Sequence, residues 1–96
     1  MAKKQLEWSL RSRNELRDIA EFYAKEASAF VAEEAYFAIE SAAESVASNP
    51  LAYREGVRAG TREYVMRRFP YTLIYRVSGE TVIIVRVMHQ AAKYFN

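Results

Sequence analysis

The sequence predicts an α+β domain in which an antiparallel sheet packs one of its faces against a helical hairpin. Two stretches, about residues 11–26 and 30–48, repeat apolar residues at the spacing of a helix stripe. The second half of the chain contains three runs rich in Val, Ile, Tyr and Phe, which is typical of strands. A further short run precedes the first helix, so the expected order is β-α-α-β-β-β.

The composition corresponds to one globular domain that spans residues 1–96, with 51% apolar and 27% charged residues. The chain contains no cysteine and one histidine, so we expect no disulfide, no metal site and no cofactor. No apolar run has the length of a signal peptide or of a membrane span, which needs roughly 20 residues. We therefore expect a cytoplasmic protein.

The first strand is predicted over residues 3–8, where apolar and polar residues alternate. Ser9 and Ser12 both qualify as the N-cap of the first helix. Ser12 is followed three residues later by Glu15, which is the spacing of a capping box. The first helix is therefore expected over about residues 11–26.

The second helix is expected to follow residues 27–29 and to end near Ser48, because Asn49 and Pro50 cannot continue it. The few residues between the two helices imply an antiparallel pair. Residues 50–60 contain a proline and two glycines and are predicted to form a loop.

Three strands are expected at about residues 61–69, 71–77 and 81–88. Ser78 and Gly79 have the chemistry of a two-residue hairpin turn between the last two strands. That turn assigns four side chains to the sheet face that meets the helices: Ile74, Ile83, Val85 and Val87. The opposite face receives Tyr71, Leu73, Tyr75, Ile84 and Arg86. A shift of the pairing by one residue would exchange the two faces.

Basic charge is concentrated in the second half of the chain. Residues 1–50 carry a net charge of −3, whereas residues 51–96 carry +5, and seven of the eight basic residues there are arginines. Arginine suits bidentate contacts with anions, so this half favours a nucleic acid or an acidic protein surface as partner. Adjacent Arg67 and Arg68 are expected to point to opposite faces of a strand. The alternative is that the arginines only solvate the sheet.

Several motifs follow one another along nearly the whole chain. They are W-S-x-x-S-x-x-E-L-x-x-I-A-x-F-Y (residues 8–23), N-P (49–50), G-x-R-E (60–63), F-P-Y-T-L-I-Y-R-V (69–77) and I-I-V-R-V-M-H (83–89). In this order and spacing they resemble the RelE/ParE toxin superfamily. The Y-R-V before the turn and the V-x-H-x-A after the last strand are most similar to the ParE branch.

The resemblance implies the toxin component of a type II toxin–antitoxin system, of the kind that stabilises plasmids, held inactive by a cognate antitoxin in a hetero-oligomer. ParE-branch toxins act on DNA gyrase, so a ParE-like chain is expected to inhibit gyrase by binding, without chemistry of its own. RelE-branch toxins instead cut mRNA on the ribosome. A degenerate toxin that mainly binds its antitoxin is a third alternative.

The residues that RelE-like nucleases use are only partly present. The resemblance places an arginine one residue after the tyrosine that opens the penultimate strand, where this chain has Thr72. It also places a basic residue just past the final strand, where this chain has Gln90. We therefore expect no catalytic residue. If the chain were a metal-independent endoribonuclease, the candidates would be Arg68, Arg76, Arg86, His89 and Tyr94.

Two binding surfaces follow from the ParE-like interpretation. The target would meet the arginine-bearing sheet and the C-terminal tail, through Arg62, Arg68, Arg76, Arg86, His89, Tyr94 and Phe95. The antitoxin would lay a helix and an extended segment over an apolar groove and the sheet edge. The residues expected to contact the antitoxin are Tyr71, Leu73, Tyr75 and Ile84. No membrane partner is expected.

Overall fold

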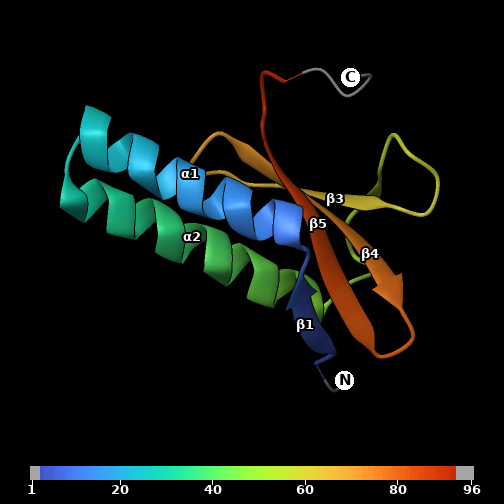
Figure 1. Cartoon of the computed structure of the whole chain (residues 1–96). Coiled ribbons are helices and arrows are strands. Elements are labelled where there is room, and N and C mark those ends of the chain that lie inside the picture. Colours follow the sequence, from blue (N-terminus) through green and yellow to red (C-terminus); the bar gives the residue numbers. More distant parts are fainter. Residues whose placement is uncertain (1–2, 93–96) are drawn as a thin grey trace.

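A computed structural model describes residues 3–92 of the chain (Figure 1). Its elements follow in the order β1 (Gln5–Trp8), α1 (Leu10–Glu26), α2 (Ala29–Ser48), β2 (Arg54–Glu55), β3 (Arg62–Val65), β4 (Tyr71–Ser78) and β5 (Thr81–His89). The predicted α+β class and the helical hairpin are confirmed. Over the described residues, neither helix combines the length and the apolar character that crossing a membrane requires.

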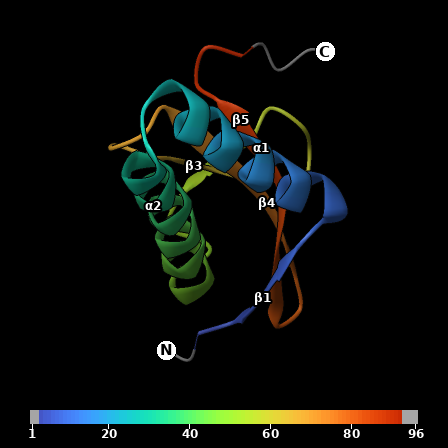
Figure 2. The same ribbon diagram turned by 60° about the vertical axis from the view of Figure 1, so that its left-hand side comes forward.

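The two helices form one layer against one face of the sheet and leave its other face open (Figure 1 and Figure 2). The strand order is β1-β5-β4-β3-β2, so β5 lies between two neighbours. The pair β1–β5 is parallel, whereas every other pair is antiparallel. The prediction of a wholly antiparallel sheet is therefore wrong. Parallel neighbours need a long crossover, and here the whole intervening chain supplies it.

The β4–β5 hairpin turns one residue later than predicted. Ser78 pairs with Thr81, so Gly79 and Glu80 form the two-residue loop. Gly79 has a φ of 59°, and no other residue of the loop has a positive φ, which matches a type II′ turn. A loop of Ser78 and Gly79 would have placed a serine at the position where this turn requires positive φ.

A β-bulge in β5 decides which of the side chains after Ile84 face the helices. Ile74 pairs with Arg86 but Tyr75 pairs with Ile84, so Val85 is an extra residue without a partner on β4. The alternation of side chains between the two faces is interrupted at this residue. Side chains after the bulge therefore lie on the opposite face from the one that strict alternation predicts.

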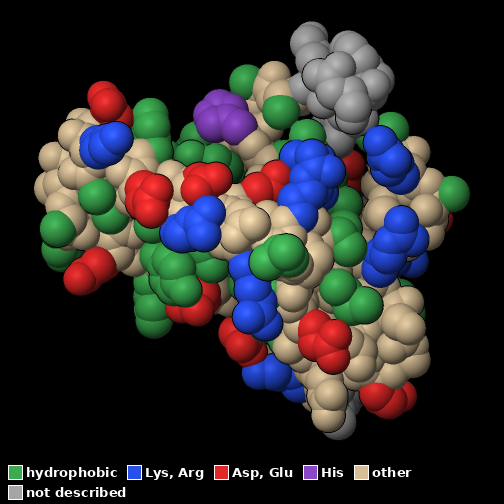
Figure 3. Space-filling view, in the orientation of Figure 1, with side chains coloured by type: hydrophobic (Ala, Val, Ile, Leu, Met, Phe, Trp, Pro, Cys, Tyr) green, Lys and Arg blue, Asp and Glu red, His purple; other side chains and the backbone are tan. Residues whose placement is uncertain are grey.

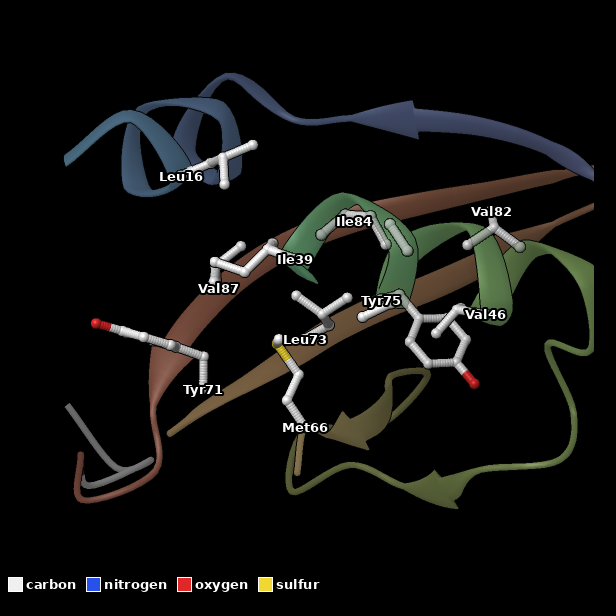
Figure 4. Close-up of a cluster of buried hydrophobic side chains, with 12 residues drawn as sticks. Leu16, Ile39, Val46, Met66, Tyr71, Leu73, Tyr75, Val82, Ile84 and Val87 are labelled. Atoms are coloured by element: carbon white, nitrogen blue, oxygen red, sulfur yellow. The ribbon is translucent and has the colours of Figure 1, made fainter. Parts of the chain in front are cut away.

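The predicted assignment of the sheet faces is wrong, because the helices cover the face that carries Leu73 and Tyr75. The face that meets the helices carries Tyr71, Leu73, Tyr75, Val82, Ile84 and Val87, each at most 6% exposed. With Leu16, Ile39, Val46 and Met66 they form the hydrophobic core (Figure 4). Of the four side chains predicted to face the helices, only Val87 does so; Ile74, Ile83 and Val85 lie on the open face.

The segment before β4 also differs from the prediction. β3 is limited to four residues, and Arg67 and Arg68 lie beyond it, both exposed, rather than on opposite faces of a strand. The N–H of Met66 still donates to the carbonyl of Tyr71, but the ladder ends there because the N–H of Tyr71 donates to the carbonyl of Phe69 instead of returning the bond. Residues 54–55, predicted to be loop, form the short edge strand β2 against β3.

Tyr75 joins the core to the loop that follows α2. Its side chain is fully buried, and its hydroxyl donates a hydrogen bond of 2.5 Å to the carbonyl of Pro50. Burial raises the pKa of Tyr75 to about 12, although the nearby positive charge of Arg62 opposes the shift. The folded-state pKa therefore lies above the unfolded value of about 10, and the fold favours the protonated hydroxyl.

We expect the stability from this group to be fully present below about pH 10 and to be lost between about pH 10 and 12, at ~1.4 kcal/mol per pH unit. Tyr75→Phe should flatten the decline and should cost about 1 kcal/mol at neutral pH, through the lost hydrogen bond. Urea unfolding measured at neutral pH and across the alkaline range checks both effects. Part of the decline should persist, because burial also raises the pKa of Tyr71; an unchanged decline would contradict the assignment.

Candidate interaction surface on the open face of the sheet

A row of side chains crosses the open face of the sheet from β3 to β5. Glu63 pairs with Ile74, and Ile74 pairs with Arg86, so these three side chains are neighbours on one face. Arg76 lies on the same face, two residues further along β4. Strand alternation therefore brings a carboxylate and two guanidinium groups to the face that the helices leave open.

These side chains surround a hollow of about 280 Å³, which we call the arginine hollow. Its basic wall consists of Arg11, Arg58, Arg76 and Arg86. Its apolar wall consists of Val57, Ile74, Val85 and Met88, and Thr61 and Glu63 complete the lining. Figure 3 shows basic side chains gathered over the strands, with apolar side chains between them. Four guanidinium groups and one carboxylate give the hollow an excess of positive charge, which favours an anionic ligand.

Arg86 is held in place by an acidic side chain of α1. Its Nε and Nη2 atoms each lie 2.8 Å from Oε2 of Glu15. The Nε of Arg11 lies 3.9 Å from the same oxygen. Within residues 3–92, Arg58 and Arg76 form no ion pair with a carboxylate, so these two supply the uncompensated charge of the arginine hollow.

Two serines join the N-terminus of α1 to the β5 bulge. Ser9 is the N-cap, because its Oγ accepts a hydrogen bond of 3.1 Å from the N–H of Ser12. The Ser9 hydroxyl donates to the carbonyl of Val85 at 3.1 Å. The Ser12 hydroxyl, fully buried, donates to the carbonyl of Ile84 at 2.7 Å. The predicted capping box of Ser12 with Glu15 is therefore wrong.

Glu15 completes this contact instead of capping the helix. Its Oε1 accepts a hydrogen bond of 2.8 Å from the N–H of Val87, while its Oε2 binds Arg86. A bulge disrupts the ladder and leaves backbone groups to be satisfied by other partners. We call Ser9, Ser12 and Glu15 the bulge clamp. The spacing S-x-x-S-x-x-E, which places the three residues on one side of a helix, is the signal from which it could have been predicted.

Glu63 is a buried carboxylate with one unused oxygen. Its side chain is 4% exposed, and its Oε1 accepts from Arg54, whose Nε and Nη2 lie at 2.9 and 2.8 Å. Its Oε2 is buried and has no hydrogen-bond partner among the described residues. Buried acceptors nearly always have a hydrogen-bond donor, so this oxygen can accept a hydrogen bond from a ligand at the wall of the arginine hollow.

The structure does not bring the four predicted target-binding arginines together. Arg62 is next to Glu63 on β3, so its side chain points to the opposite face, which is the helix side. It donates to a loop carbonyl at 2.7 Å. Arg68 pairs with Glu34 of α2 at 2.8 Å. Of the four predicted arginines, only Arg76 and Arg86 line the arginine hollow.

His89 lies on the helix side of the sheet, opposite the arginine hollow. It pairs with Tyr71 across β4 and β5, and the two rings meet edge to face with centroids 5.4 Å apart. Its Nδ1 accepts a hydrogen bond of 3.1 Å from the N–H of Ala91. Tyr94 and Phe95, the remaining predicted target-binding residues, lie outside the described residues.

The predicted antitoxin-binding residues are core residues. Tyr71, Leu73, Tyr75 and Ile84 are at most 6% exposed and belong to the cluster beneath the helices. All four lie on the helix side of the sheet: the three β4 residues alternate along one face, and Ile84 pairs with Tyr75 before the bulge. The expectation that they line an exposed apolar groove is therefore wrong, because no partner can reach them while the helices cover the sheet.

The two positions that separate the toxin branches have structural roles. Thr72 is 1% exposed, in a strand with neighbours on both sides. The side-chain amide of Gln90 donates to the carbonyls of Met66 and Tyr71 at 2.8 and 3.1 Å. Among residues 3–92, no three His, Asp or Glu side chains come together as a metal site would need.

Three charged residues of the arginine hollow were not predicted from the sequence as site residues: Arg11, Arg58 and Glu63. Arg11 and Arg58 belong to a helix start and a loop, and only the tertiary fold brings them to the sheet. Glu63 did carry a signal, since it is the one acidic residue in a strand segment that is otherwise basic, aromatic and aliphatic. An acidic residue with that surrounding is expected to be paired or functional when it is buried.

Comparisons with known proteins agree with the fold. A family model described as "ParE toxin of type II toxin-antitoxin system, parDE" matches residues 6–94. A protein of Sinorhizobium fredii, named "Putative toxin Y4kP", is 33% identical over 89 residues, which make up 93% of this chain and 91% of that protein.

Two solved structures are similar over most of the chain. A chain of the chromosomal ParDE system from P. aeruginosa has a TM-score of 0.83 and 22% identity, and the match covers 91% of this chain and 96% of that one. A chain of the RelBE2 toxin–antitoxin complex from Mycobacterium tuberculosis has a TM-score of 0.66 and 26% identity, with coverages of 96% and 97%.

Proposed function

Because the chain belongs to the ParE toxin family of type II toxin–antitoxin systems, we propose that it acts by binding a target through the arginine hollow, and that the target is DNA gyrase. In this proposal the chain performs no chemistry and inhibits gyrase by occupying one of its surfaces. The hollow combines arginines with a concave apolar wall, and both features are enriched where protein interfaces concentrate their binding energy.

The observation that carries the proposal is the separation of the arginines from His89. Cleavage of RNA without a metal needs a general acid or base within hydrogen-bond reach of the groups that bind the phosphate. Here the sheet stands between the single histidine of the chain and the pair Arg76 and Arg86. This arrangement suits electrostatic contact better than proton transfer, so it favours binding over cleavage.

We also propose that a cognate antitoxin binds this chain in a hetero-oligomer. The similar proteins from P. aeruginosa and Mycobacterium tuberculosis were solved as parts of toxin–antitoxin systems. We assign the antitoxin to the outer side of the helical hairpin, where Phe30 and Phe37 are 68% and 71% exposed and lie two helical turns apart on α2. Exposed aromatic residues on one helix face are typical of a site that an amphipathic helix covers.

Arg76→Glu is expected to weaken the inhibition of gyrase strongly. The substitution reverses the charge of an unpaired arginine in the arginine hollow, so the concentration needed to inhibit plasmid supercoiling by half should rise about tenfold or more. Arg13→Glu makes the same change on the exposed surface of α1 and serves as the control. His89→Ala, on the other side of the sheet, should inhibit as the unsubstituted chain does.

Normal supercoiling in the presence of the folded, antitoxin-free chain would overturn gyrase as the target. Cleavage of ribosome-bound mRNA that depends on Arg76 and Arg86 would then establish the RelE-like alternative. If neither activity were present and the chain still bound its antitoxin, it would be a degenerate toxin.

A further inference from the structure

The arginine hollow contains two kinds of polar group that have no partner within the described residues. Arg58 and Arg76 line it and form no ion pair within residues 3–92. Glu63 lines it too, is 4% exposed, and keeps Oε2 without a donor among the described residues. Cationic donors and a buried anionic acceptor therefore lie in one hollow of about 280 Å³.

The two unpaired arginines suit an oxyanion ligand. Guanidinium groups bind carboxylates and phosphates through paired N–H donors. Glu15 pairs with Arg86 at 2.8 Å and also lies near Arg11, so the two hollow arginines that have no carboxylate partner within the described residues are Arg58 and Arg76. A ligand with one or two negative charges at this position would match it.

Glu63 and the apolar wall distinguish between the two classes of anion. A nucleic-acid strand would bring several phosphates towards a buried carboxylate, and its sugar–phosphate backbone has no N–H to donate. A polypeptide carries a main-chain N–H at nearly every residue. It can also place one carboxylate beside the arginines and an aliphatic side chain against Val85 and Met88. The lining therefore favours a protein ligand.

We infer that the arginine hollow binds an extended segment of a partner protein in which an acidic residue adjoins an aliphatic one. The acidic side chain lies between Arg58 and Arg76, and the aliphatic side chain packs on Val85 and Met88. A main-chain N–H of the segment donates to Oε2 of Glu63. The inference deepens the proposed function and rests on it for the identity of the partner, because it specifies the chemistry of the contact with the target.

An NMR titration of the isolated chain with N-acetyl-glutamyl-leucine amide tests the inference. We expect saturable shifts of signals from Arg58, Glu63, Arg76 and Val85. N-acetyl-glutaminyl-leucine amide differs only in lacking the carboxylate, and it should bind about fivefold more weakly. Inorganic phosphate provides the free anion without a main-chain N–H or an aliphatic group, and it should also bind more weakly than the glutamyl probe.

Substitutions in the chain separate the contributions. Arg76→Gln should weaken binding of the glutamyl probe about fivefold. Arg13→Gln on α1, outside the hollow, should leave that binding unchanged. Glu63→Gln replaces an acceptor oxygen with a donor and removes a negative charge. The substitution should therefore weaken binding of the dipeptide and strengthen binding of phosphate. If the role of Glu63 were purely structural, binding of both probes would weaken. If the Glu63 variant does not fold, Arg76→Gln decides the question alone.

Equal binding of the two dipeptide amides would overturn the inference. Shifts caused by phosphate but not by the dipeptide would also overturn it and would reassign the hollow to a nucleic-acid backbone. These outcomes do not depend on gyrase. Gyrase inhibition that is insensitive to both Arg58→Gln and Arg76→Gln would refute the inference and leave gyrase as the target. Dipeptide binding without gyrase inhibition would refute the target alone.

Discussion

Truncating Leu73 to alanine is expected to lower the free energy of unfolding by about 3–4 kcal/mol, because the side chain is fully buried between the sheet and the helices (Figure 4). Ile83→Ala, in the adjacent strand, should cost only about 1 kcal/mol, because Ile83 is half-buried on the open face. For a domain of this size the larger loss corresponds to a fall of about 15–25 °C in Tm.

Urea unfolding of the two variants, analysed by linear extrapolation, gives both values under the same conditions. The comparison is informative because the face assignment predicted from the sequence gives the reverse order, with Ile83 towards the helices and Leu73 away from them. A larger loss from Ile83→Ala than from Leu73→Ala would contradict the observed assignment of the two sheet faces.

The helices could be predicted from the sequence, whereas the bulge in β5 could not. The helices were predictable because their apolar stripes recur over several turns and Asn49-Pro50 ends the second one. The bulge was not predictable in the same way, because residues 82–85 are all β-branched and aliphatic and contain no glycine to mark a break. One extra residue in β5 exchanges the faces of the residues that follow it, so Arg86 lies on the open face and Val87 on the helix side.

Glu15→Ala is expected to cost about 2–3 kcal/mol of stability. The substitution leaves the N–H of Val87 without an acceptor at the bulge and Arg86 without its ion-pair partner. Both charged side chains are about three-quarters covered, at 21% and 26% exposed, so solvent screens the pair only partly. Glu15→Gln keeps an acceptor for Val87 and removes only the charge, so it should cost about 1 kcal/mol.

Unfolding by urea at low and at high salt checks this expectation. The difference between Glu15→Ala and Glu15→Gln should persist in high salt, because it reports a hydrogen bond to the backbone, whereas the charge effect should shrink. Equal losses for the two variants would mean that Glu15 acts only through Arg86 and that the bulge does not need its carboxylate.

The candidate site was predictable only in part, for a related physical reason. Arg76 and Arg86 were named as candidates from the sequence, but strict alternation places them on opposite faces, and the bulge brings Arg86 to the face of Arg76. Arg62 and Arg68 were grouped with them, but alternation turns the first to the helix side, and the early end of β3 lets the second reach α2. Contacts of a loop arginine such as Arg58 depend on tertiary packing, which local patterns do not encode.

The position of β5 has a consequence for how the chain folds during synthesis. β5 is the last strand to leave the ribosome, yet it lies between β1 and β4, and it pairs residues as distant in sequence as Leu6 and Val82. Such long-range pairing must close a large loop before any contact compensates for the lost chain entropy. The core cannot close before β5 has left the ribosome, so we expect the nascent chain to remain unfolded until that strand has been synthesised.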